Sequence, residues 1–400
     1  MIELVLGALS LALLSAQLPA AFLLLARLLR GARRQRPIQP RQQTHSTAAS
    51  VSVVVPTLNE AHRVKPCLLG LCAQGEVVRE ILVVDSHSTD GTQAVIEAIA
   101  QQDARVRLIS DDPLPVGWVG RPWALHTGFL RSHAESDWIL GIDADTQPQP
   151  GLVESLLHEA NQHRYDMVSL SPKFILKSAG EWWLQPAMLM TLIYRFDSAG
   201  VQVPQTDRAM ANGQCFLSRR SVLAQLDGYR CAASSFCDDV TLVREAARQG
   251  FTVGFLDGAE VIRVRMYEGI AETWRGWGRS LDLKDSISRA QLGSDLWLLL
   301  STQALPIPLL LIASVVISSY GWAIAGSPML AGAIALNLFL LAMRLGMQIA
   351  VAGSYDWSRR DRVRSLFFWL APLADPLAVL RIVLSASQRS IQWRGRIYSH

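Results

Sequence analysis

Val51-Ser-Val-Val-Val-Pro-Thr-Leu-Asn-Glu60 is the stretch of this sequence that decides its fold. Its first five residues form a run rich in β-branched side chains that Pro56 ends, which predicts a buried strand. Helix-like stretches such as Gln93 to Gln102 separate the strands that follow. Alternating strands and helices predict an α/β domain with a parallel sheet covered by helices on both faces. Three further runs of the same kind occur at Glu80-Ile-Leu-Val-Val-Asp85, Val106-Arg-Leu-Ile-Ser110 and Trp138-Ile-Leu-Gly-Ile-Asp143.

Polar side chains stand where these strands end. Asn59 and Glu60 follow the first strand, Asp85 ends the second, and Asp143 and Asp145 follow the fourth. In open α/β sheets, ligands bind beyond the carboxyl ends of the strands. We therefore expect these side chains to share one binding site.

Asp143-Ala-Asp145 is the sharpest local signal. Two acids one residue apart on extended chain point to the same side. Mg²⁺ prefers one or two carboxylates together with phosphate oxygens, so this pair fits a cation held between the protein and a diphosphate, where it would offset charge on a leaving diphosphate. A solvated loop with two acids is the alternative.

Two other segments carry acids that fit chemistry. In Asp85-Ser-His-Ser-Thr-Asp-Gly-Thr92 a carboxylate at a strand end could bind a base and ribose, although a helix cap and turn is the alternative, to which Asp90 conforms. Asp238 and Asp239 precede a helical stretch. Paired carboxylates resist ionising together, so one becomes a better base; helix capping is again the alternative.

Arg121 lies in Trp118-Val-Gly-Arg-Pro-Trp-Ala-Leu-His-Thr-Gly128 and could reach a phosphate bidentately. His126, in the same segment, could simply be a satisfied polar group. The cysteines form no CxxC pair and no His/Cys grouping has zinc spacing, so we expect free thiols. The cysteines are at positions 67, 72, 215, 231 and 237.

Composition limits the class of protein. Half of the 400 residues are hydrophobic and 18% are charged, against about 25% charged in soluble domains, which excludes a disordered chain. Five cysteines exclude a disulfide scaffold. The net charge of +4 does not suggest a nucleic-acid binder.

The excess apolar content is concentrated at the two ends. Leu4 to Ala26 carries no charge and is followed by arginines, which predicts an uncleaved anchor with its arginine side in the cytoplasm; a buried core helix is the alternative. Leu296 to Met343 is long enough for two spans with a turn at Tyr320 to Pro328. A charge at mid-bilayer costs several kcal/mol, so Ser365 to Ser387, broken by Asp375 and Arg381, is expected to be interfacial or re-entrant.

The predicted organisation has five parts. They are a transmembrane anchor at 1–30, a basic linker at 31–50, the α/β domain at 51–290, two transmembrane helices at 291–353, and a basic loop, an interfacial or re-entrant segment and a cytoplasmic tail at 354–400.

The ordered set of motifs resembles the family 2 glycosyltransferases, which have a GT-A fold with a Rossmann-like mixed sheet. Val-Val-Val-Pro-Thr-Leu-Asn-Glu60 is similar to the opening strand motif, and Asp143-Ala-Asp145 to the metal-binding DxD motif. Asp85 opens a segment similar to the nucleotide-contacting motif, with Ser86 where a second Asp is common. Gly120 to Gly128 resembles Gly-Lys-x-x-Ala-Leu-Asn-x-Gly, with Arg121 for Lys and His126 for Asn. Asp238-Asp239 matches a Glu-Asp pair whose second acid is the catalytic base.

This resemblance implies an inverting hexosyltransferase. A nucleotide-sugar, expected to be a UDP-sugar, would bind over the sheet with its diphosphate on Mg²⁺ or Mn²⁺ held by Asp145 and Asp143. Asp239, paired with Asp238, would take a proton from an acceptor hydroxyl. The remaining donor contacts implied by the resemblance are those of Pro56, Asn59, Glu60, Asp85 and Arg121.

Two basic-aromatic segments could clamp the diphosphate. Trp274-Arg-Gly-Trp-Gly-Arg279 supplies Arg275 and Arg279, in an order unlike the Gln-x-x-Arg-Trp motif of processive synthases, and Trp393-Arg-Gly-Arg396 resembles the ending of ceramide-glucosyltransferase-like enzymes. With three membrane segments a polymer channel is not expected. The sequence thus favours transfer of one sugar to a membrane lipid by an integral membrane protein whose catalytic domain faces the cytoplasm.

A hydroxylated carotenoid is the expected acceptor. Gly180-Glu-Trp-Trp-Leu-Gln-Pro186 and Ser234-Ser-Phe-Cys-Asp-Asp239 resemble segments of membrane glycosyltransferases that act on hydroxylated carotenoids. Lys173 to Phe196 reads as an interfacial helix or, alternatively, a core helix. Hopanoid, ceramide-like or glycerolipid acceptors stay open, as do a non-catalytic nucleotide-sugar binding subunit and a nucleotidyltransferase.

Overall fold

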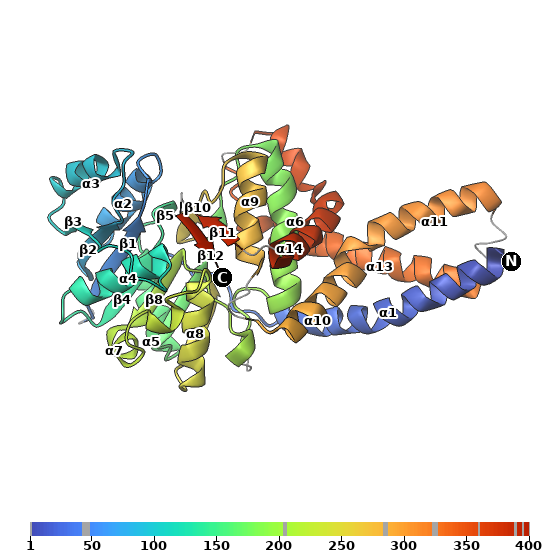
Figure 1. Ribbon diagram of the computed structural model, residues 1–400, viewed down its shortest axis with the longest axis horizontal. Helices are drawn as coiled ribbons and strands as arrows, with labels where there is room; N and C mark the ends of the chain where they lie inside the picture. The colour runs from blue at the N-terminus through green and yellow to red at the C-terminus, as the bar shows by residue number, and fades with distance from the viewer. Residues whose placement is uncertain are drawn as a thin grey trace.

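A computed structural model describes most of the chain (Figure 1). The described residues are 2–41, 49–202, 206–282, 287–321, 327–358, 361–387, 390–393 and 396–399.

The centre of the α/β domain is a seven-stranded mixed sheet with the order β3-β2-β1-β4-β8-β6-β9. Strands β3, β2, β1 and β4 are parallel, whereas β8 runs antiparallel to both β4 and β6. The bounds are β1 Val51–Thr57, β2 Val78–Asp85, β3 Val106–Ser110, β4 Trp138–Ile142, β6 Met167–Ser171, β8 Cys215–Arg219 and β9 Val253–Asp257. All four strands expected from the sequence form and lie side by side, and the GT-A mixed sheet is confirmed.

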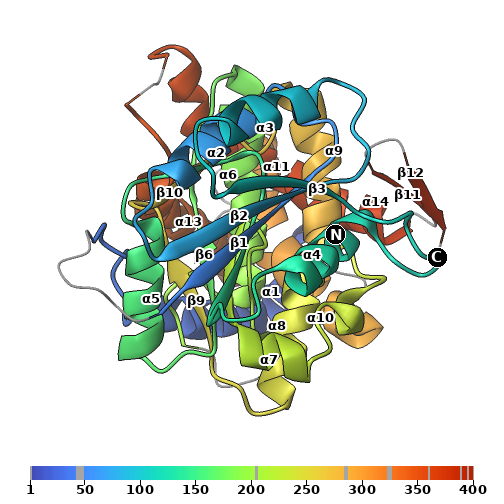
Figure 2. The ribbon, with the colours of Figure 1, turned by 90° about the vertical axis from the view of Figure 1, so that its left-hand side faces the viewer.

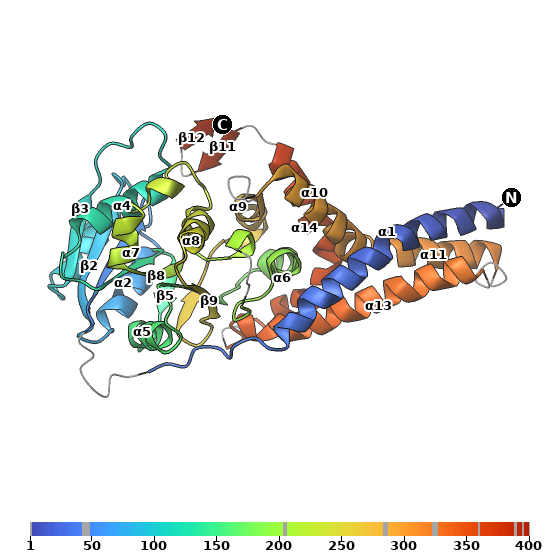
Figure 3. The same ribbon diagram turned by 90° about the horizontal axis from the view of Figure 1, so that it is seen from below.

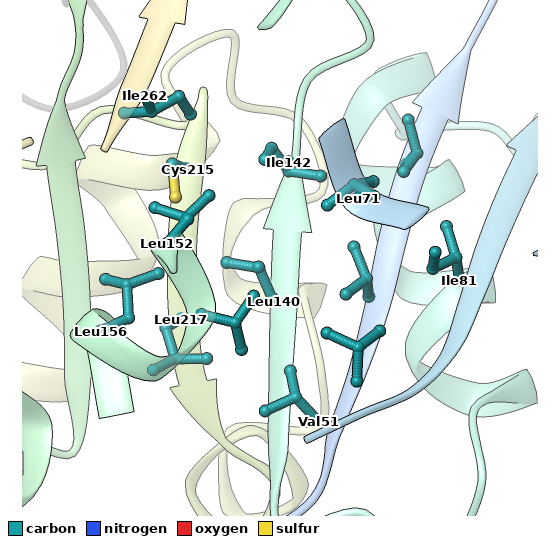
Figure 4. Packing of buried hydrophobic residues seen from close by; sticks show 14 of the residues in the cluster. Val51, Leu71, Ile81, Leu140, Ile142, Leu152, Leu156, Cys215, Leu217 and Ile262 are labelled. Atoms are coloured by element: carbon teal, nitrogen blue, oxygen red, sulfur yellow. The ribbon is translucent and has the colours of Figure 1, made fainter. Parts of the chain in front are cut away.

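Helices cover both faces of this sheet (Figure 2). Val53 and Val55 of β1 pack with α2, α3 and α5 on one face, and Val54 packs with α4, α7 and α8 on the other. Figure 4 shows part of the first cluster, where Leu140 and Leu156 lie between the strands and α5. The bounds are α2 Val64–Cys72, α3 Thr92–Ala100, α4 Gly120–Arg131, α5 Leu152–Gln162, α7 Arg220–Gln225 and α8 Asp238–Arg248. Alternate residues of a strand face opposite ways, so a strand with two covered faces reads as a continuous apolar run.

The chain also has two smaller sheets and several short helices. A three-stranded sheet joins β5 Thr146–Pro148, β10 Ile262–Val264 and β7 Lys173–Phe174, and a hairpin near the C-terminus pairs β11 Ser390–Trp393 with β12 Arg396–Ser399. Short 3-10 helices are η1 Thr206–Arg208, η2 Arg230–Ala232, η4 Ala352–Ser354, η5 Arg364–Phe368 and η6 Ala371–Ala374.

A helical layer lies between the sheet and the long apolar helices (Figure 1). It consists of α6 Ala179–Phe196, α9 Gly269–Asp282 and α14 Asp375–Ser387, which pack around buried Trp182, Tyr355 and Phe368. Ser178 caps α6 by accepting a hydrogen bond from the Glu181 N–H, and the Glu181 carboxylate bonds back to the Ser178 N–H. This reciprocal capping box fixes where α6 begins.

The long apolar helices extend away from the sheet domain (Figure 3). Two candidate membrane spans cover Val5–Gly31 and Pro328–Ser354, and the bent pair Arg289–Ala304 and Pro306–Tyr320 adds a third if it is one span. The helices concerned are α1 Ile2–Gly31, α10 Arg289–Leu299, the π-helix η3 Leu300–Ala304, α11 Pro306–Tyr320 and α13 Pro328–Val351. The N- and C-terminal apolar helices expected from the sequence are therefore present.

The segment 365–387 does not form a long helix. It is divided into η5, η6 and α14, and buries one face against α6 and α9. The other face is exposed and apolar, with Leu366, Leu370, Leu373, Leu377, Leu380 and Leu384 each at least 36% exposed.

Candidate active site

The site lies at the carboxyl edge of the sheet where the order of strands reverses. The chain passes from β1 outward to β2 and β3, then returns to place β4 on the other side of β1. Ligands bind at such switch points. Asp143 and Asp145 directly follow β4, and the antiparallel β8 brings residues 212–214 to the same edge, because Cys215 pairs with Ile142 and the Asp143 N–H donates to the Gln214 carbonyl at 3.2 Å.

Arg121, at the start of α4, joins three parts of this edge. Its Nε donates to Asp143 Oδ1 at 2.9 Å, its Nη2 donates to the Gly213 carbonyl at 2.6 Å, and its Nη1 is paired with Asp238 Oδ2. The Arg121 side chain is 16% exposed. A Cβ on Gly213 would lie 2.5 Å from Arg121 Nη2, so the absence of a side chain at position 213 lets the guanidinium approach.

Asp238 and Asp239 form the first turn of α8. The Gly213 N–H donates to Asp239 Oδ2 at 2.6 Å. Burial raises the pKa of Asp238 to about 7, although the Arg121 guanidinium opposes the shift. Burial raises the pKa of Asp239 also, against the same guanidinium. The two acids lie at a helix N-terminus, which agrees with the alternative interpretation that they cap the helix. Both also line a cavity together with Arg121 and Asp143.

The DxD acids are close to Glu60 and to the thiol of Cys67. The Cys67 thiol donates to the Asp143 carbonyl at 3.6 Å, and Thr146 Oγ1 donates to that carbonyl at 2.7 Å, closing the turn after β4. Burial raises the pKa of Cys67 to about 12, with smaller contributions from the negative charges of Asp145, Asp143 and Glu60. The structure thus brings these three acids together around one buried, protonated thiol.

The donor set suits a divalent cation that shares its ligands with a substrate. No group of three or more His, Cys, Asp or Glu side chains within the described ranges could hold a metal by itself. Asp143 lines the cavity and Asp145 lies two residues further along the same turn. Mg²⁺-type sites are often completed by substrate phosphates. One Asp143 oxygen is already bonded to Arg121, so a cation and Arg121 would have to share this carboxylate.

Asp85 lies at the end of β2, fully buried. Its carboxylate accepts hydrogen bonds from Thr57 Oγ1 at 3.1 Å, from the Ser88 N–H and Oγ at 2.9 and 2.5 Å, and from Gln93 Nε2 at 2.7 Å. These bonds organise the loop between β2 and α3. Contact of Asp85 with a base, expected from the sequence, stays a prediction, and it would need one of these donors to be exchanged.

The β1–α2 loop and the β2–α3 loop are hydrogen-bonded to each other. Asn59, with a left-handed φ of 55°, accepts from the Thr89 N–H at 2.9 Å, and the Glu60 N–H donates to Thr92 Oγ1 at 2.8 Å. Asp90 accepts a hydrogen bond from the Thr92 N–H at 3.0 Å, which agrees with the alternative interpretation of this residue as part of a helix cap and turn. Pro56 is half-buried within β1. These contacts hold the two loops together at the ends of β1 and β2.

Other predicted residues lie outside the acid cluster. Arg275 is exposed on α9 and is not among the described residues that line the cavity. Arg279 belongs to the same helix, but its side chain lies outside the described part of the structure, as do residues 394–395 of the C-terminal motif. His126 is buried, accepts from the Tyr229 N–H at 3.3 Å and stacks on Trp118, so it is a satisfied polar group. All five cysteines are free.

A cavity of about 240 Å³ opens from the acid cluster, and sequence reasoning did not find it. Its walls come from α6, the loop 210–214, the segment 235–240, the ends of β6 and β9, α9 and the end of α13. These segments are far apart in the sequence. The apolar stripe along 173–196 was the one signal that could have pointed to it.

The mixed sheet with acids at its switch point has the GT-A fold. Residues 52–227 match the model of the family described as Glycosyl transferase family 2. A mannosyltransferase from Pyrobaculum calidifontis, solved with GDP-Man and Mn²⁺, shares the fold over 95% of this chain and 98% of its own, with a TM-score of 0.50 and 17% identity.

Curated relatives match parts of the chain. A 4,4'-diaponeurosporenoate glycosyltransferase from Staphylococcus haemolyticus is 25% identical over 238 residues, which is 59% of this chain and 62% of that protein. The dolichol-phosphate mannosyltransferase of Saccharomyces cerevisiae is 28% identical over 120 residues, 29% of this chain and 43% of that protein. The chain therefore covers less than two thirds of the length of each.

Proposed function

We propose that this protein is an inverting glycosyltransferase that transfers one sugar from a nucleotide-sugar to a hydroxyl group of a membrane lipid. The observation that carries the proposal is the cluster of Asp143, Asp238 and Asp239 around Arg121, which opens on a cavity beside candidate membrane helices. The family 2 match over residues 52–227 supports the reaction class.

In the proposed reaction, Asp239 accepts the proton of the acceptor hydroxyl. The acceptor oxygen then forms a bond with the anomeric carbon of the sugar while the bond from that carbon to the nucleoside diphosphate breaks, and the diphosphate leaves with the electron pair. Burial, which raises the pKa of Asp239, makes it a stronger base than an exposed carboxylate. The Gly213 N–H fixes the orientation of the Asp239 carboxylate.

Asp143 and Asp145 would hold a divalent cation, Mg²⁺ or Mn²⁺, which offsets charge on the leaving diphosphate when it is bound. Arg121 positions Asp143 relative to Asp238 through its two carboxylate contacts. The presence of Mn²⁺ in the mannosyltransferase structure that shares this fold supports a cation at this place. A UDP-sugar is the donor that we propose, on the resemblance of the Asp85 segment to nucleotide-contacting motifs.

We propose a hydroxylated carotenoid as the acceptor. The support is the partial similarity to the diaponeurosporenoate glycosyltransferase, together with the apolar wall that α6 contributes to the cavity. The arginines that follow α1 favour a catalytic domain on the cytoplasmic side of the membrane.

The test uses full-length protein in lipid vesicles that contain a hydroxylated carotenoid, with Mn²⁺ and a panel of nucleotide-sugars. Asp239→Asn should abolish glycolipid formation and retain nucleotide binding, whereas Asp227→Asn, an exposed acid paired with Arg230, should retain full turnover. Full activity of Asp239→Asn would refute the assignment of the base. Nucleotide binding without turnover by the unaltered protein would indicate a binding subunit, and pyrophosphate release would indicate a nucleotidyltransferase; both results contradict the proposal.

A further inference from the structure

The cavity beside the acids is lined mainly by apolar side chains. One wall is a face of α6, and the opposite walls come from the loop before β8, the turn before α8, and β9. The apolar lining side chains used here are Leu189, Leu192, Ile193, Phe196, Met210 and Phe236. A nucleotide-sugar is polar along its whole length, so it does not account for such a surface.

The cavity extends from the acids to the membrane helices. Asp143, Asp238 and Asp239 line one part of it, and Val351 and Ser354 line another. Val351 is the last residue of α13, and Ser354 ends the candidate span Pro328–Ser354. A molecule lying along α13 can therefore place one end beside the acids without crossing bulk water.

Trp277 of α9 is one of the residues that line the cavity. The side chain is 2% exposed, and its indole Nε1 has no hydrogen-bond partner among the described residues. Most buried polar groups in proteins are hydrogen-bonded, and an indole N–H can only donate. A ligand oxygen that enters the cavity would supply the missing acceptor.

We infer that this cavity binds the hydroxyl-bearing end of an apolar acceptor, with Trp277 donating a hydrogen bond to an oxygen of that end. The inference rests on the proposed function and adds the acceptor site to it. The cavity, at about 240 Å³, is slightly smaller than the ~300–1,000 Å³ of ordinary ligand pockets. It therefore receives the end group of a long lipid, and the remainder of the lipid lies along the membrane helices.

Two variants test this site, with one matched control. Leu192→Trp places a larger side chain in the α6 wall, while Leu108→Trp makes the same change at a half-buried leucine of β3 that is outside the cavity. For Leu192→Trp we expect the KM for a vesicle-borne hydroxylated carotenoid to rise at least tenfold, with a smaller change in the donor KM. Leu108→Trp should leave both values near those of the unaltered protein.

Trp277→Phe removes the N–H and keeps an aromatic ring. We expect a rise of about fivefold in the acceptor KM, which is what one net hydrogen bond of ~1 kcal/mol corresponds to. An unchanged acceptor KM in both cavity variants would overturn the inference. A rise confined to the donor KM would also overturn it, because the cavity would then hold the donor sugar.

A labelling experiment does not depend on turnover. A C18 alcohol with a diazirine beside its hydroxyl should crosslink the unaltered protein on α6 or on residues 210–214 after illumination, and a carotenoid diol should compete. Labels confined to the lipid-facing sides of α1 and α13 would overturn the inference. Failure of the proposed function has a different signature, since the donor would then not be consumed at all.

Discussion

Arg121 is predicted to be the residue whose loss most damages the acid cluster. Its guanidinium, 16% exposed, contacts Asp143, Asp238 and the Gly213 carbonyl. Removing one partner of a buried ion pair leaves the other charge buried and unpaired, which lowers the free energy of unfolding by about 3–5 kcal/mol. Arg121→Met should therefore lower the stability of the catalytic domain by that amount.

The measurement is thermal unfolding of the purified protein in detergent at one scan rate. For a domain of 150–250 residues, about 2–4 °C of Tm corresponds to 1 kcal/mol, so we expect a decrease of about 6–20 °C. Arg121→Lys keeps the charge but lacks the planar guanidinium that hydrogen-bonds to three acceptors. Its decrease in Tm should therefore be smaller than that of Arg121→Met. Arg230→Met removes an arginine that is 68% exposed and is the control.

The loss of stability in Arg121→Met should depend on pH. Burial raises the pKa of Asp238 to about 7, above the value of ~3.9 for an unfolded aspartate. A raised carboxyl pKa means that the folded state favours the protonated acid. In Arg121→Met the charged Asp238 carboxylate has lost its buried partner, so the loss of stability should be largest above pH 7 and should decrease as pH falls towards 5. Adding Asp238→Asn to Arg121→Met should recover part of the lost stability. A Tm loss equal to that of Arg230→Met, or one that grows at low pH, would refute this account of the cluster.

Three further predictions concern packing, metal binding and thiol reactivity. Gly128→Ala should destabilise the protein by about 1–3 kcal/mol in thermal unfolding, as overpacking does, because its Cβ would lie 2.2 Å from a Val54 methyl carbon; an unchanged Tm would contradict the close approach of α4 to β1. Asp145→Asn should weaken Mn²⁺ binding at least tenfold in the presence of a nucleoside diphosphate, measured by electron paramagnetic resonance, and equal affinity would exclude Asp145 as a ligand. Maleimide at pH 7.5 should label exposed Cys231 before Cys67, whose pKa burial raises to about 12, and mass spectrometry showing equal labelling of the folded protein would contradict that burial.

The first half of the sheet was predictable because its strands are short apolar runs at regular spacing. The run at Val51–Val55 became β1, and the run at Val106–Ser110 became β3 with the same bounds. The strands β6, β8 and β9 carry polar residues such as Ser169 and Ser218 inside the sheet. They were not predicted individually, since their order in the sheet depends on tertiary pairing rather than on local pattern.

The candidate site was predictable as a list of acids, but not as a geometry. The sequence predicted that Asp143 follows a strand and that Asp239 lies near the start of a helix, and both do so. Arg121 was expected to bind a phosphate. In the structure its guanidinium contacts Asp143, Asp238 and the Gly213 carbonyl, and phosphate binding by Arg121 stays a prediction. No spacing rule links positions 121, 213 and 238, because they come from α4, the loop before β8 and the start of α8.

The buried pair of Arg344 and Asp375 connects the membrane helices to the site. Arg344 lies within α13 and donates to Asp375, the first residue of α14, at 2.7 and 3.0 Å. Both side chains are at most 3% exposed, and a charge within a span is retained where it pairs inside the protein. Because α13 also ends at the cavity beside the acids, this pair links the exposed apolar face of α14 to the position of Val351. In the arrangement that we propose, this apolar face lies on the lipid surface and the pair holds the acids at a fixed height above it, as transfer to a lipid hydroxyl requires.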